Sequence, residues 1–508
     1  MFLKKLLVIF FFTLITANTY GGFKDWPAYA NTMGRESIAV DGPDTIDSNT
    51  LEWIADADPQ DPNYYVSFEG TTQPIVYNGK VYAYAGYFEP NEQSPNGRDY
   101  TNSQIIAYDA NSGQMLWNTV IDIASWTSWS SPAVDTKNNN VLMSSGDKVY
   151  AIDASTGAVS WTTELDMFAV NASVCTAVDM SNARAFITDC DLSNQGKLYC
   201  INLDVNGPNN PYEPGQIVWS QVIGNTLGNT PAYRNGVVYV STAGDENSRG
   251  TIYAYDATAN NAVELWKFTN PSNEGFWGGV VVTKDSYLYA ATCDYYGDEE
   301  DNSTLFKIDC NDGGVVWSTP VQATDCVPVV VGDKIYLSGE YEFGVRKVKA
   351  YQDLGTSVVK LWETDSYLSI GGWDNQPVYA NGKLYIGAKS PEGMTYDELY
   401  ILNVAVTPDD PNFIIAHYTN NACGSSRAVI YDSLYAIGTD GLFKFHQPSL
   451  LADINKNDVV DFCDLAELAA VWLYDGPVGI TRADLNLDGK VNFEDFSLLA
   501  GSWYGEVD

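Results

Sequence analysis

The stretch Ala107-Tyr108-Asp109-Ala110-Asn111-Ser112-Gly113-Gln114-Met115-Leu116-Trp117 has the pattern of two strands joined by a tight turn. Asp109 can accept hydrogen bonds from the turn backbone, and Gly113 can take the positive φ that such a turn needs. The same pattern returns from Ala151 through Thr156-Gly157 to Trp161. Looser copies end at Trp219, Trp266, Trp317 and Trp362, and a degenerate copy ends near His417 and Tyr418.

A second hairpin pattern precedes each of these copies. It consists of a short strand, a turn of Asn, Asp or Gly, and an aromatic strand, as in Pro74–Tyr82, Pro231–Tyr239 and Pro377–Tyr385. The two patterns together predict four antiparallel strands in each unit. Units of this kind that recur about every 45–60 residues are typical of propeller blades.

Counting these units predicts the number of blades. The inner hairpins begin near Pro74, Pro132, Thr176, Pro231, Gly279, Pro328, Pro377 and Arg427. The closing strands after the first hairpin number only seven, and the missing one is the strand around Trp53. We therefore expect an all-β, eight-bladed propeller of four-stranded antiparallel blades over residues 51–448, in which the N-terminal strand completes the last blade. Such closure leaves no long open sheet edge.

The repeated motif Ala-x-Asp-x-x-Ser/Thr-Gly-x-x-x-Trp resembles that of the pyrroloquinoline-quinone-like repeat family. The resemblance implies a propeller in which the Trp side chains pack between neighbouring blades. It does not decide function, since the family contains both quinone-dependent dehydrogenases and non-enzymatic scaffolds. Members that bind the quinone typically carry a vicinal Cys pair. The eight cysteines here are dispersed, so we do not expect this cofactor.

Two matching loops near the C-terminus, 31 residues apart, carry oxygen ligands in alternation. Side-chain oxygens stand at loop positions 1, 3, 5, 9 and 12, and position 7 can add a backbone carbonyl. Alternation of this kind directs six to eight oxygens at one hard cation, which predicts two Ca²⁺ sites. The expected ligand positions are Asp453, Asn455, Asn457, Val459, Asp461 and Asp464 in the first loop, and Asp484, Asn486, Asp488, Lys490, Asn492 and Asp495 in the second.

A helix with one apolar stripe is predicted after each loop, ending near Trp472 and Trp503. Residues 449–508 thus resemble a type I dockerin, a calcium-binding module that docks to cohesin domains, often in polysaccharide-degrading systems. The chain departs from that family at Asn457, where Asp is usual, and at recognition positions 10 and 11. These positions hold Phe462-Cys463 and Phe493-Glu494 in place of Ser/Thr pairs, so the expected partner is a cohesin-like or another surface docking protein. A purely stabilising cap is the alternative.

The N-terminus resembles a secretory signal, with Lys4 and Lys5 ahead of an apolar run that is too short to span a bilayer. We expect a signal peptide at 1–17, a lead-in at 18–50, and a protein that is secreted or held at the cell surface, with the periplasm as another possibility. A net charge of −38 disfavours nucleic acid and anionic membranes as partners. No later segment is apolar enough to be a membrane span.

Exposed-looking aromatic residues in the loops that lead into the inner strands, Phe276 among them, suggest a ligand face at Trp129, Trp277 and Trp373. Neighbouring loops are acidic, and aromatic platforms beside carboxylates suit glycans, other neutral ligands or cations. The competing interpretation is that these Trp plug the central channel. The sequence favours a non-catalytic binding or scaffold protein. A quinone-dependent oxidoreductase, a polysaccharide-active hydrolase or lyase, and an envelope-assembly scaffold remain the alternatives.

The cysteines of an exported protein are often oxidised to disulfides. Cys175 and Cys190 flank a predicted hairpin that turns near Ser181 and Asn182, at equal distances from the turn. This predicts a disulfide between them, with free buried thiols as the alternative.

Overall fold

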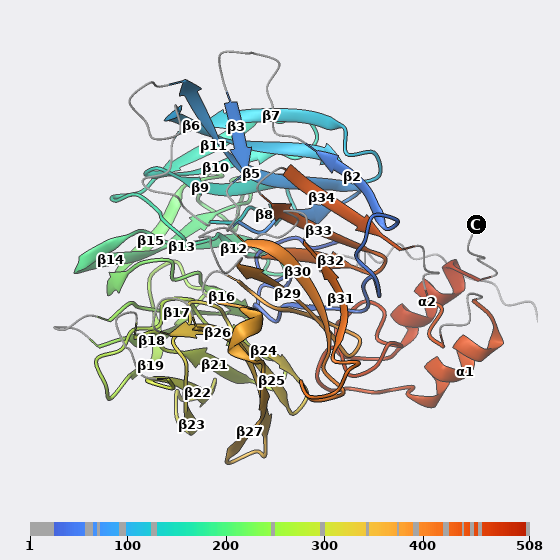
Figure 1. Ribbon diagram of the computed structural model, residues 1–508. Coiled ribbons are helices and arrows are strands. Elements are labelled where there is room, and N and C mark those ends of the chain that lie inside the picture. Colours follow the sequence, from blue (N-terminus) through green and yellow to red (C-terminus); the bar gives the residue numbers. More distant parts are fainter. Residues whose placement is uncertain are drawn as a thin grey trace, which may run out of the picture.

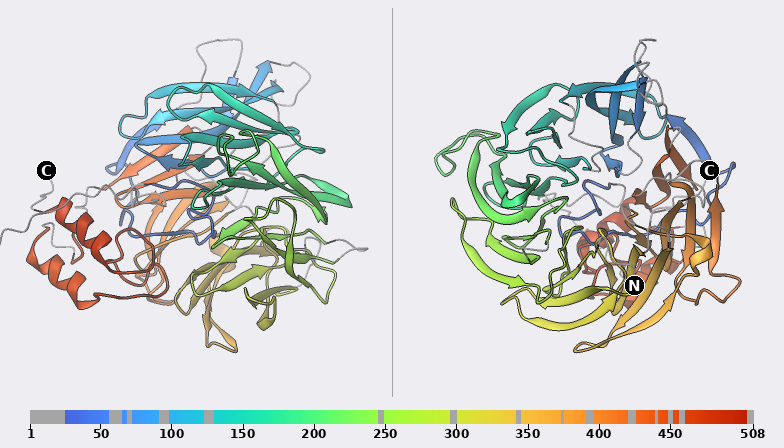
Figure 2. Two further views of the ribbon diagram at one scale, coloured as in Figure 1. Left: turned by 180° about the vertical axis from the view of Figure 1, so that it is seen from behind. Right: turned by 60° about the vertical axis from the view of Figure 1, so that its left-hand side comes forward.

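A computed structural model of the chain describes most of residues 25–503. The described ranges are 25–55, 65–68, 72–90, 98–122, 130–244, 249–294, 300–341, 345–372, 375–389, 396–419, 426–438, 441–447, 452–455 and 460–503. They form eight antiparallel sheets arranged as a ring, with two helices beside it (Figures 1 and 2). The prediction of an eight-bladed propeller with a small helical C-terminal module is confirmed.

The first four blades contain sixteen strands in sequence order, from the inner to the outer edge. They are β4 (Ile75–Tyr77), β5 (Lys80–Pro90), β6 (Arg98–Asp109) and β7 (Met115–Ile121); β8 (Ala133–Asp135), β9 (Asn140–Ser145), β10 (Lys148–Asp153) and β11 (Val159–Glu164); β12 (Cys175–Ala177), β13 (Arg184–Thr188), β14 (Asp191–Asn202) and β15 (Ile217–Thr226); β16 (Ala232–Arg234), β17 (Val237–Ser241), β18 (Thr251–Asp256) and β19 (Glu264–Thr269). The strand β3 (Tyr65–Phe68) also pairs with β5.

The other four blades follow the same order. They are β20 (Val281–Val282), β21 (Tyr287–Ala291), β22 (Ser303–Asp309) and β23 (Val315–Val321); β24 (Val329–Val331), β25 (Lys334–Tyr341), β26 (Val345–Asp353) and β27 (Val358–Glu363); β28 (Val378–Ala380), β29 (Lys383–Lys389), β30 (Tyr396–Asn403) and β31 (Ile414–Tyr418); β32 (Arg427–Ile430), β33 (Ser433–Gly438), β34 (Gly441–His446) and β2 (Leu51–Ala55). A 3-10 turn, η1 (Ser366–Leu368), follows blade six.

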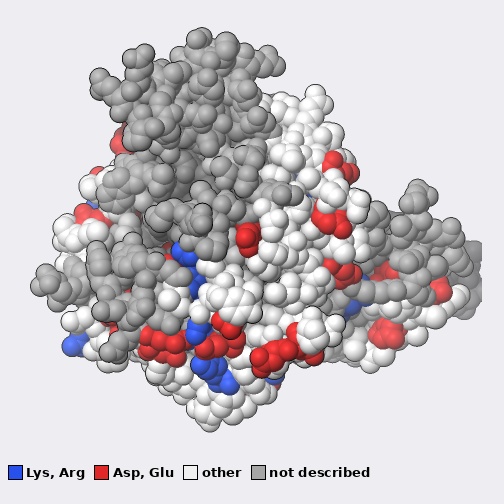
Figure 3. Space-filling view, viewed as in Figure 1, with Lys and Arg blue, Asp and Glu red and all other residues white. Residues whose placement is uncertain are grey.

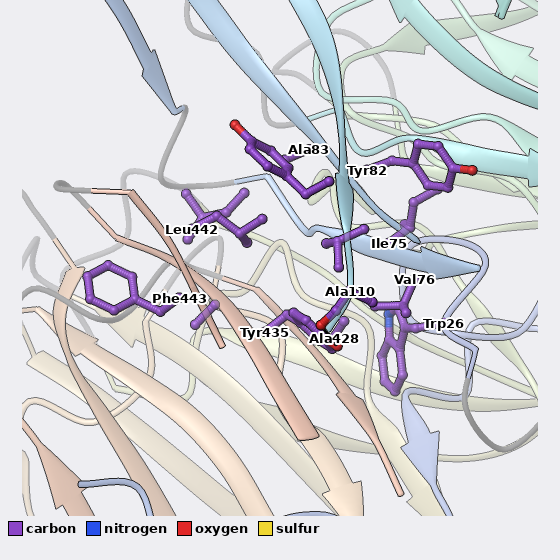
Figure 4. Close-up of a cluster of buried hydrophobic side chains, with 14 of the residues drawn as sticks. Trp26, Ile75, Val76, Tyr82, Ala83, Ala110, Ala428, Tyr435, Leu442 and Phe443 are labelled. Atoms are coloured by element: carbon purple, nitrogen blue, oxygen red, sulfur yellow. Dashed lines mark hydrogen bonds between the residues drawn. The ribbon is translucent and has the colours of Figure 1, made fainter. Parts of the chain in front are cut away.

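The ring closes in the eighth blade. There β2 pairs antiparallel with β34, and Trp53 stands opposite Lys444. The expected completion of the last blade by the N-terminal strand is therefore confirmed. Around this seam a large apolar cluster joins the first and last blades, including Tyr82, Tyr435 and Phe443 (Figure 4).

The repeated Trp and Gly residues interlock neighbouring blades. The ring of Trp117 in blade one lies against Gly157 of blade two, and Trp53 lies in the same way against Gly113 of blade one. Trp266 also donates its Nε1 hydrogen to the Cys310 carbonyl of the next blade, at 2.7 Å. These contacts explain the Gly at positions 113 and 157, since a Cβ there would collide with the indole.

We predict that Gly157→Ala destabilises the chain by about 2–4 kcal/mol. Its φ of +77° strains any other residue, and a Cβ would lie 2.8 Å from Trp117 Cδ2. Gly79→Ala is the matched control, because Gly79 has a φ of +72° but no atom within 4 Å of its added Cβ. Denaturant unfolding of both variants measures the difference, and equal losses would contradict the interlocking role.

The lead-in segment has a role that the sequence did not reveal. Residues 25–46, here called the strap, run across the middle of the ring and contact one inner strand after another (Figure 2). The backbone of the strap pairs with that of blades one, two, four, five and seven. The bonds are Trp26 with Val76 in both directions, Pro27 O with Val134 N, Met33 O with Tyr233 N, Gly34 O with Val282 N, and Ser37 O with Tyr379 N.

The strap is buried and ends in a short strand. Trp26 and Arg35 are fully buried, and Arg35 donates to the carbonyls of Tyr29 and Pro231. The strand β1 (Ile38–Ala39) then pairs in parallel with β28 of blade seven. The propeller therefore carries part of its own N-terminal region along its axis.

Candidate metal centres and docking module

The C-terminal module consists of two similar halves packed together. The helices α1 (Phe462–Ala470) and α2 (Phe493–Gly501) each follow one of the predicted loops. Leu468 and Leu499 are buried between the halves, and Trp472 and Trp503 pack against the same core just beyond the helix ends. The predicted apolar stripe of each helix is thus present, although Ala469 and Ala500 are exposed.

Each helix begins with a capping box that orients a ligand residue. In α2 the Asn492 side chain accepts from the Glu494 amide at 2.7 Å, while Asp495 Oδ2 accepts from the Asn492 amide at 2.9 Å. Asp461 and Asp464 repeat this arrangement in α1. Because the cap turns the position-12 carboxylate back toward its loop, a helix start also builds the metal site.

The second loop brings most of its predicted ligands together. Asp484 accepts from the amides of Asp488 and Gly489 at 3.1 and 2.9 Å, and Asp495 Oδ1 accepts from the Leu485 amide at 2.7 Å. Asn486 Oδ1 and Asp488 Oδ1 accept from backbone amides of the same loop. Gly489 has a φ of +72°, as position 6 requires. Asp484 and Asp495 are fully buried.

The buried carboxylates of this loop oppose one another's ionisation. Burial, followed by the neighbouring Asp495 and Asp488, raises the pKa of Asp484 to about 8. Burial also raises the pKa of Asp495. A divalent cation would relieve this cost by compensating the charges at the loop centre.

The first loop contains a buried side-chain oxygen that suits a cation ligand. Asn455 Oδ1 is buried and accepts no hydrogen bond from any residue that the structure describes. Asp453 and Asp464 are buried beside it, and Asp464 Oδ1 accepts from the Asn455 amide at 3.1 Å. An orphaned buried oxygen normally has a partner. The predicted ligands Asn457 and Val459 lie outside the described residues.

The donor set as a whole fits a hard cation. Within the described ranges no three His, Cys, Asp or Glu residues make a metal cluster by themselves. Asn oxygens and a backbone carbonyl have to complete each site, and such mixed, all-oxygen ligand sets suit Ca²⁺. When bound, the ion would supply charge compensation and fix the loop geometry. The residues of the chain hold it and join each loop to its helix.

Family comparisons agree with both parts of this architecture. A family model described as "Outer membrane protein assembly factor BamB" matches residues 63–211 and 211–397. A second, described as "Dockerin type I domain", matches residues 451–501. The chain belongs to the PQQ-like repeat family and ends in a type I dockerin domain. Comparison with curated proteins gave no match.

Solved structures share the fold of the propeller. The quinohemoprotein alcohol dehydrogenase of Pseudomonas putida HK5 is similar, with a TM-score of 0.52 and 10% identity over 83% of this chain and 77% of that one. A europium-containing methanol dehydrogenase has a TM-score of 0.52 and 11% identity over 83% and 89% of the chains. BamB from Moraxella catarrhalis has a TM-score of 0.49 and 18% identity over 74% and 94%.

The dockerin domain presents two exposed aromatic residues at the recognition positions. Phe462 and Phe493 are 71% and 76% exposed. Each lies edge-to-face on a Trp of the other half: Phe462 on Trp503 and Phe493 on Trp472, both with centroids 5.2 Å apart. The two halves therefore offer equivalent apolar patches at the start of their helices.

The structure describes only part of the predicted ligand face of the propeller. Trp129 and Trp373 lie outside the described residues, and Trp277 is half-buried. Phe276, which the sequence groups with these aromatics as exposed, is fully buried against Phe268 and Phe306. That expectation was wrong, because Phe276 fills the core between blades four and five.

The predicted disulfide is wrong. Cys175 and Cys190 are both free thiols. The hairpin between them exists, but its register places Cys175 opposite Phe186, so Cys190 lies beyond the paired residues. Cys175 instead packs under the strap, where its thiol lies near the Met33 carbonyl. Burial raises the pKa of Cys175 to about 11, which keeps it a thiol.

No helix within the described ranges combines the length and the apolar character of a membrane crossing. Both histidines lie in blade strands. The His417 ring stacks on Tyr400 and its Nε2 is 3.0 Å from Glu398, while His446 Nδ1 is 3.1 Å from Ser433 Oγ.

Proposed function

We propose that the chain is a secreted, non-catalytic binding protein, whose propeller is fixed to an extracellular or cell-surface assembly by its calcium-loaded dockerin domain. Its partner there is a cohesin-type domain. Glycans, or other neutral or cationic ligands, would bind the propeller, and the assembly would process polysaccharide. The polysaccharide part of the proposal is supported only by the dockerin resemblance.

The pair of exposed Phe residues is the observation that carries the docking proposal. Isolated apolar residues are common on surfaces, but two large exposed rings at equivalent places on a duplicated module indicate a pair of docking patches. Docking would bury both rings against the partner, and large aromatic side chains contribute strongly to such interfaces. Acidic side chains on the face of the dockerin domain seen in Figure 3 favour a partner that is neutral or basic around its apolar contact.

We predict that the double substitution Phe462→Ser and Phe493→Ser weakens cohesin binding by at least about tenfold, since a hot-spot aromatic residue contributes about 2 kcal/mol or more. The test is binding of the full chain to immobilised cohesin domains encoded in the same genome, with calcium and with chelator. Tyr367→Ser on the propeller is the matched control, since Tyr367 is 76% exposed. Binding that survives chelation, or that the double variant retains fully, would refute the proposal.

A further inference from the structure

The dockerin domain does not stand apart from the propeller, because one lysine joins it to blade five. Lys284, in the turn between β20 and β21, lies 2.7 Å from Asp475 Oδ1 and donates to the Gly489 carbonyl at 2.5 Å. Gly489 is position 6 of the second calcium loop. Its amide donates to Asp484, the ligand at position 1. A single residue of the loop therefore links a metal ligand to the propeller.

An arginine makes the corresponding connection for the first calcium loop. Arg482 donates to the Ile454 carbonyl at 2.6 Å, and Ile454 stands between the ligands Asp453 and Asn455. Its other terminal nitrogen lies 3.0 Å from Asp41 Oδ2 of the strap. Asp41 is buried and also pairs with Lys383 of blade seven, at 3.1 Å. Both loops are thus held by ionic contacts to the ring.

Apolar side chains fill the space between these two contacts. Val478 is buried in a cluster with Ile38 of the strap and Val331 of blade six. Leu487, at position 4 of the second loop, packs against the same cluster. The junction also encloses a cavity of about 510 Å³ between the strap, the inner hairpin turns and the second loop.

We propose that the dockerin domain docks on the propeller as a calcium-dependent unit, with Lys284, Arg482 and Val478 as the contacts that couple the two calcium loops to the ring. This inference does not rest on the proposed function, since it needs no external partner. Calcium fixes the loop backbone, and therefore the positions of the Gly489 and Ile454 carbonyls. Without calcium the loop carboxylates repel each other, and the loop backbone no longer holds these two carbonyls in position to accept from Lys284 and Arg482.

The coupling has to act in both directions. If calcium favours docking, docking favours calcium by the same factor, because the two free energies belong to one thermodynamic cycle. The propeller therefore strengthens calcium binding by the domain it holds. A substitution that weakens the junction without touching any calcium ligand lowers the apparent calcium affinity.

A zero-length carbodiimide cross-link tests the docking directly. In the full chain this reagent condenses the Lys284 amine with the adjacent Asp475 carboxylate to an amide, which peptide mass spectrometry detects. Lys148 on blade two and Asp122, just after the outer strand of blade one, are the internal control, with Nζ and Oδ2 at 2.5 Å and both groups part-exposed. We expect the junction cross-link with calcium and its loss with chelator, while the control forms in both. A junction cross-link that is absent with calcium, or unchanged by chelator, overturns the proposal.

Calcium titration of Val478→Ser in the full chain tests the coupling. Val478 is 5% exposed and lies outside both loops. We expect calcium affinity to fall by at least about fivefold, the lower end of usual coupling strengths. The control Val205→Ser, at a residue 73% exposed on blade three, should leave it unchanged. Unchanged affinity in Val478→Ser alongside a lost cross-link would overturn the coupling.

Discussion

Removal of calcium from the full chain is expected to unfold the dockerin domain and to leave the propeller folded. Among its described residues the domain has a small core of seven buried apolar residues, and four buried carboxylates belong to the predicted ligand set of one or the other loop. Saturation at about 1,000 times the dissociation constant adds about 4 kcal/mol to stability, which is a large share for so small a unit. Circular dichroism with chelator should lose the helical signal, and hydrogen exchange should rise in α1 and α2 only.

Asp495→Ala separates the metal effect from general destabilisation. It removes the predicted position-12 ligand of the second loop, so calorimetry should detect one calcium-binding event, where the unaltered chain is expected to give two. Glu494→Ala is the adjacent control, because Glu494 is exposed and, among the described residues, its carboxylate accepts a hydrogen bond from Asn486 alone, at 3.1 Å. Two undiminished binding events in Asp495→Ala would show that this loop is not a calcium site.

The second large effect is expected in the propeller, where Asp353→Ala should cost about 3–5 kcal/mol. Asp353 accepts from Lys307 at 2.7 Å, Tyr289 at 2.9 Å and Trp317 at 3.0 Å. Lys307 and Asp353 are each only 6% exposed. Removal of the carboxylate leaves a buried ammonium group without its counter-charge. Denaturant unfolding of the full chain measures the loss.

Asp109→Ala is the matched control for this substitution. Asp109 lies in the corresponding turn of blade one, one residue earlier in the strand register, but it is only partly buried, and among the described residues its carboxylate bonds within its own turn, to Asn111 and Ser112. Its removal should cost about 1 kcal/mol. Equal losses at the two positions would show that the turn, and not the buried ion pair, determines the stability.

The contribution of Asp353 should also depend on pH. Burial by itself would raise the pKa of Asp353, but hydrogen bonds from Lys307, Gly355, Tyr289 and Trp317 outweigh it and hold the pKa below its ordinary value. A lowered folded pKa means that the stabilisation is complete above the unfolded pKa of about 3.9 and is lost as pH falls through the folded value. The difference in the free energy of unfolding between the original chain and Asp353→Ala should therefore be constant near neutral pH and shrink below about pH 4.

The blades were predictable because their signals are local. A Gly that needs positive φ and a Trp that needs a neighbouring surface recur at fixed spacing, so blade number and ring closure follow from counting. The strap was not predictable in this way. Its residues Ala30, Asn31, Arg35 and Ser37 adopt positive φ without being Gly, and their conformations are held by bonds to distant blades.

The same distinction applies to the candidate sites. Ligand spacing in the loops is a sequence property, and the predicted helix after each loop is present as α1 and α2. The roles of Lys284 and Arg482 depend on contacts between two domains. A local sequence pattern does not predict such contacts. The disulfide prediction failed for a related reason: equal distances from a turn do not fix strand register, and the hairpin of β12 and β13 pairs with an offset.

The strap also bears on the order in which the ring is assembled. It meets blades one, two, four, five and seven in the order in which a ribosome makes them. When each of these inner strands is synthesised, the strap residues that pair with it therefore already exist. Only the seam between β2 and β34 must wait for the end of the propeller, because its two strands begin at Leu51 and Gly441. The nascent ring can grow in sequence, and its last step is a single closure of two distant segments.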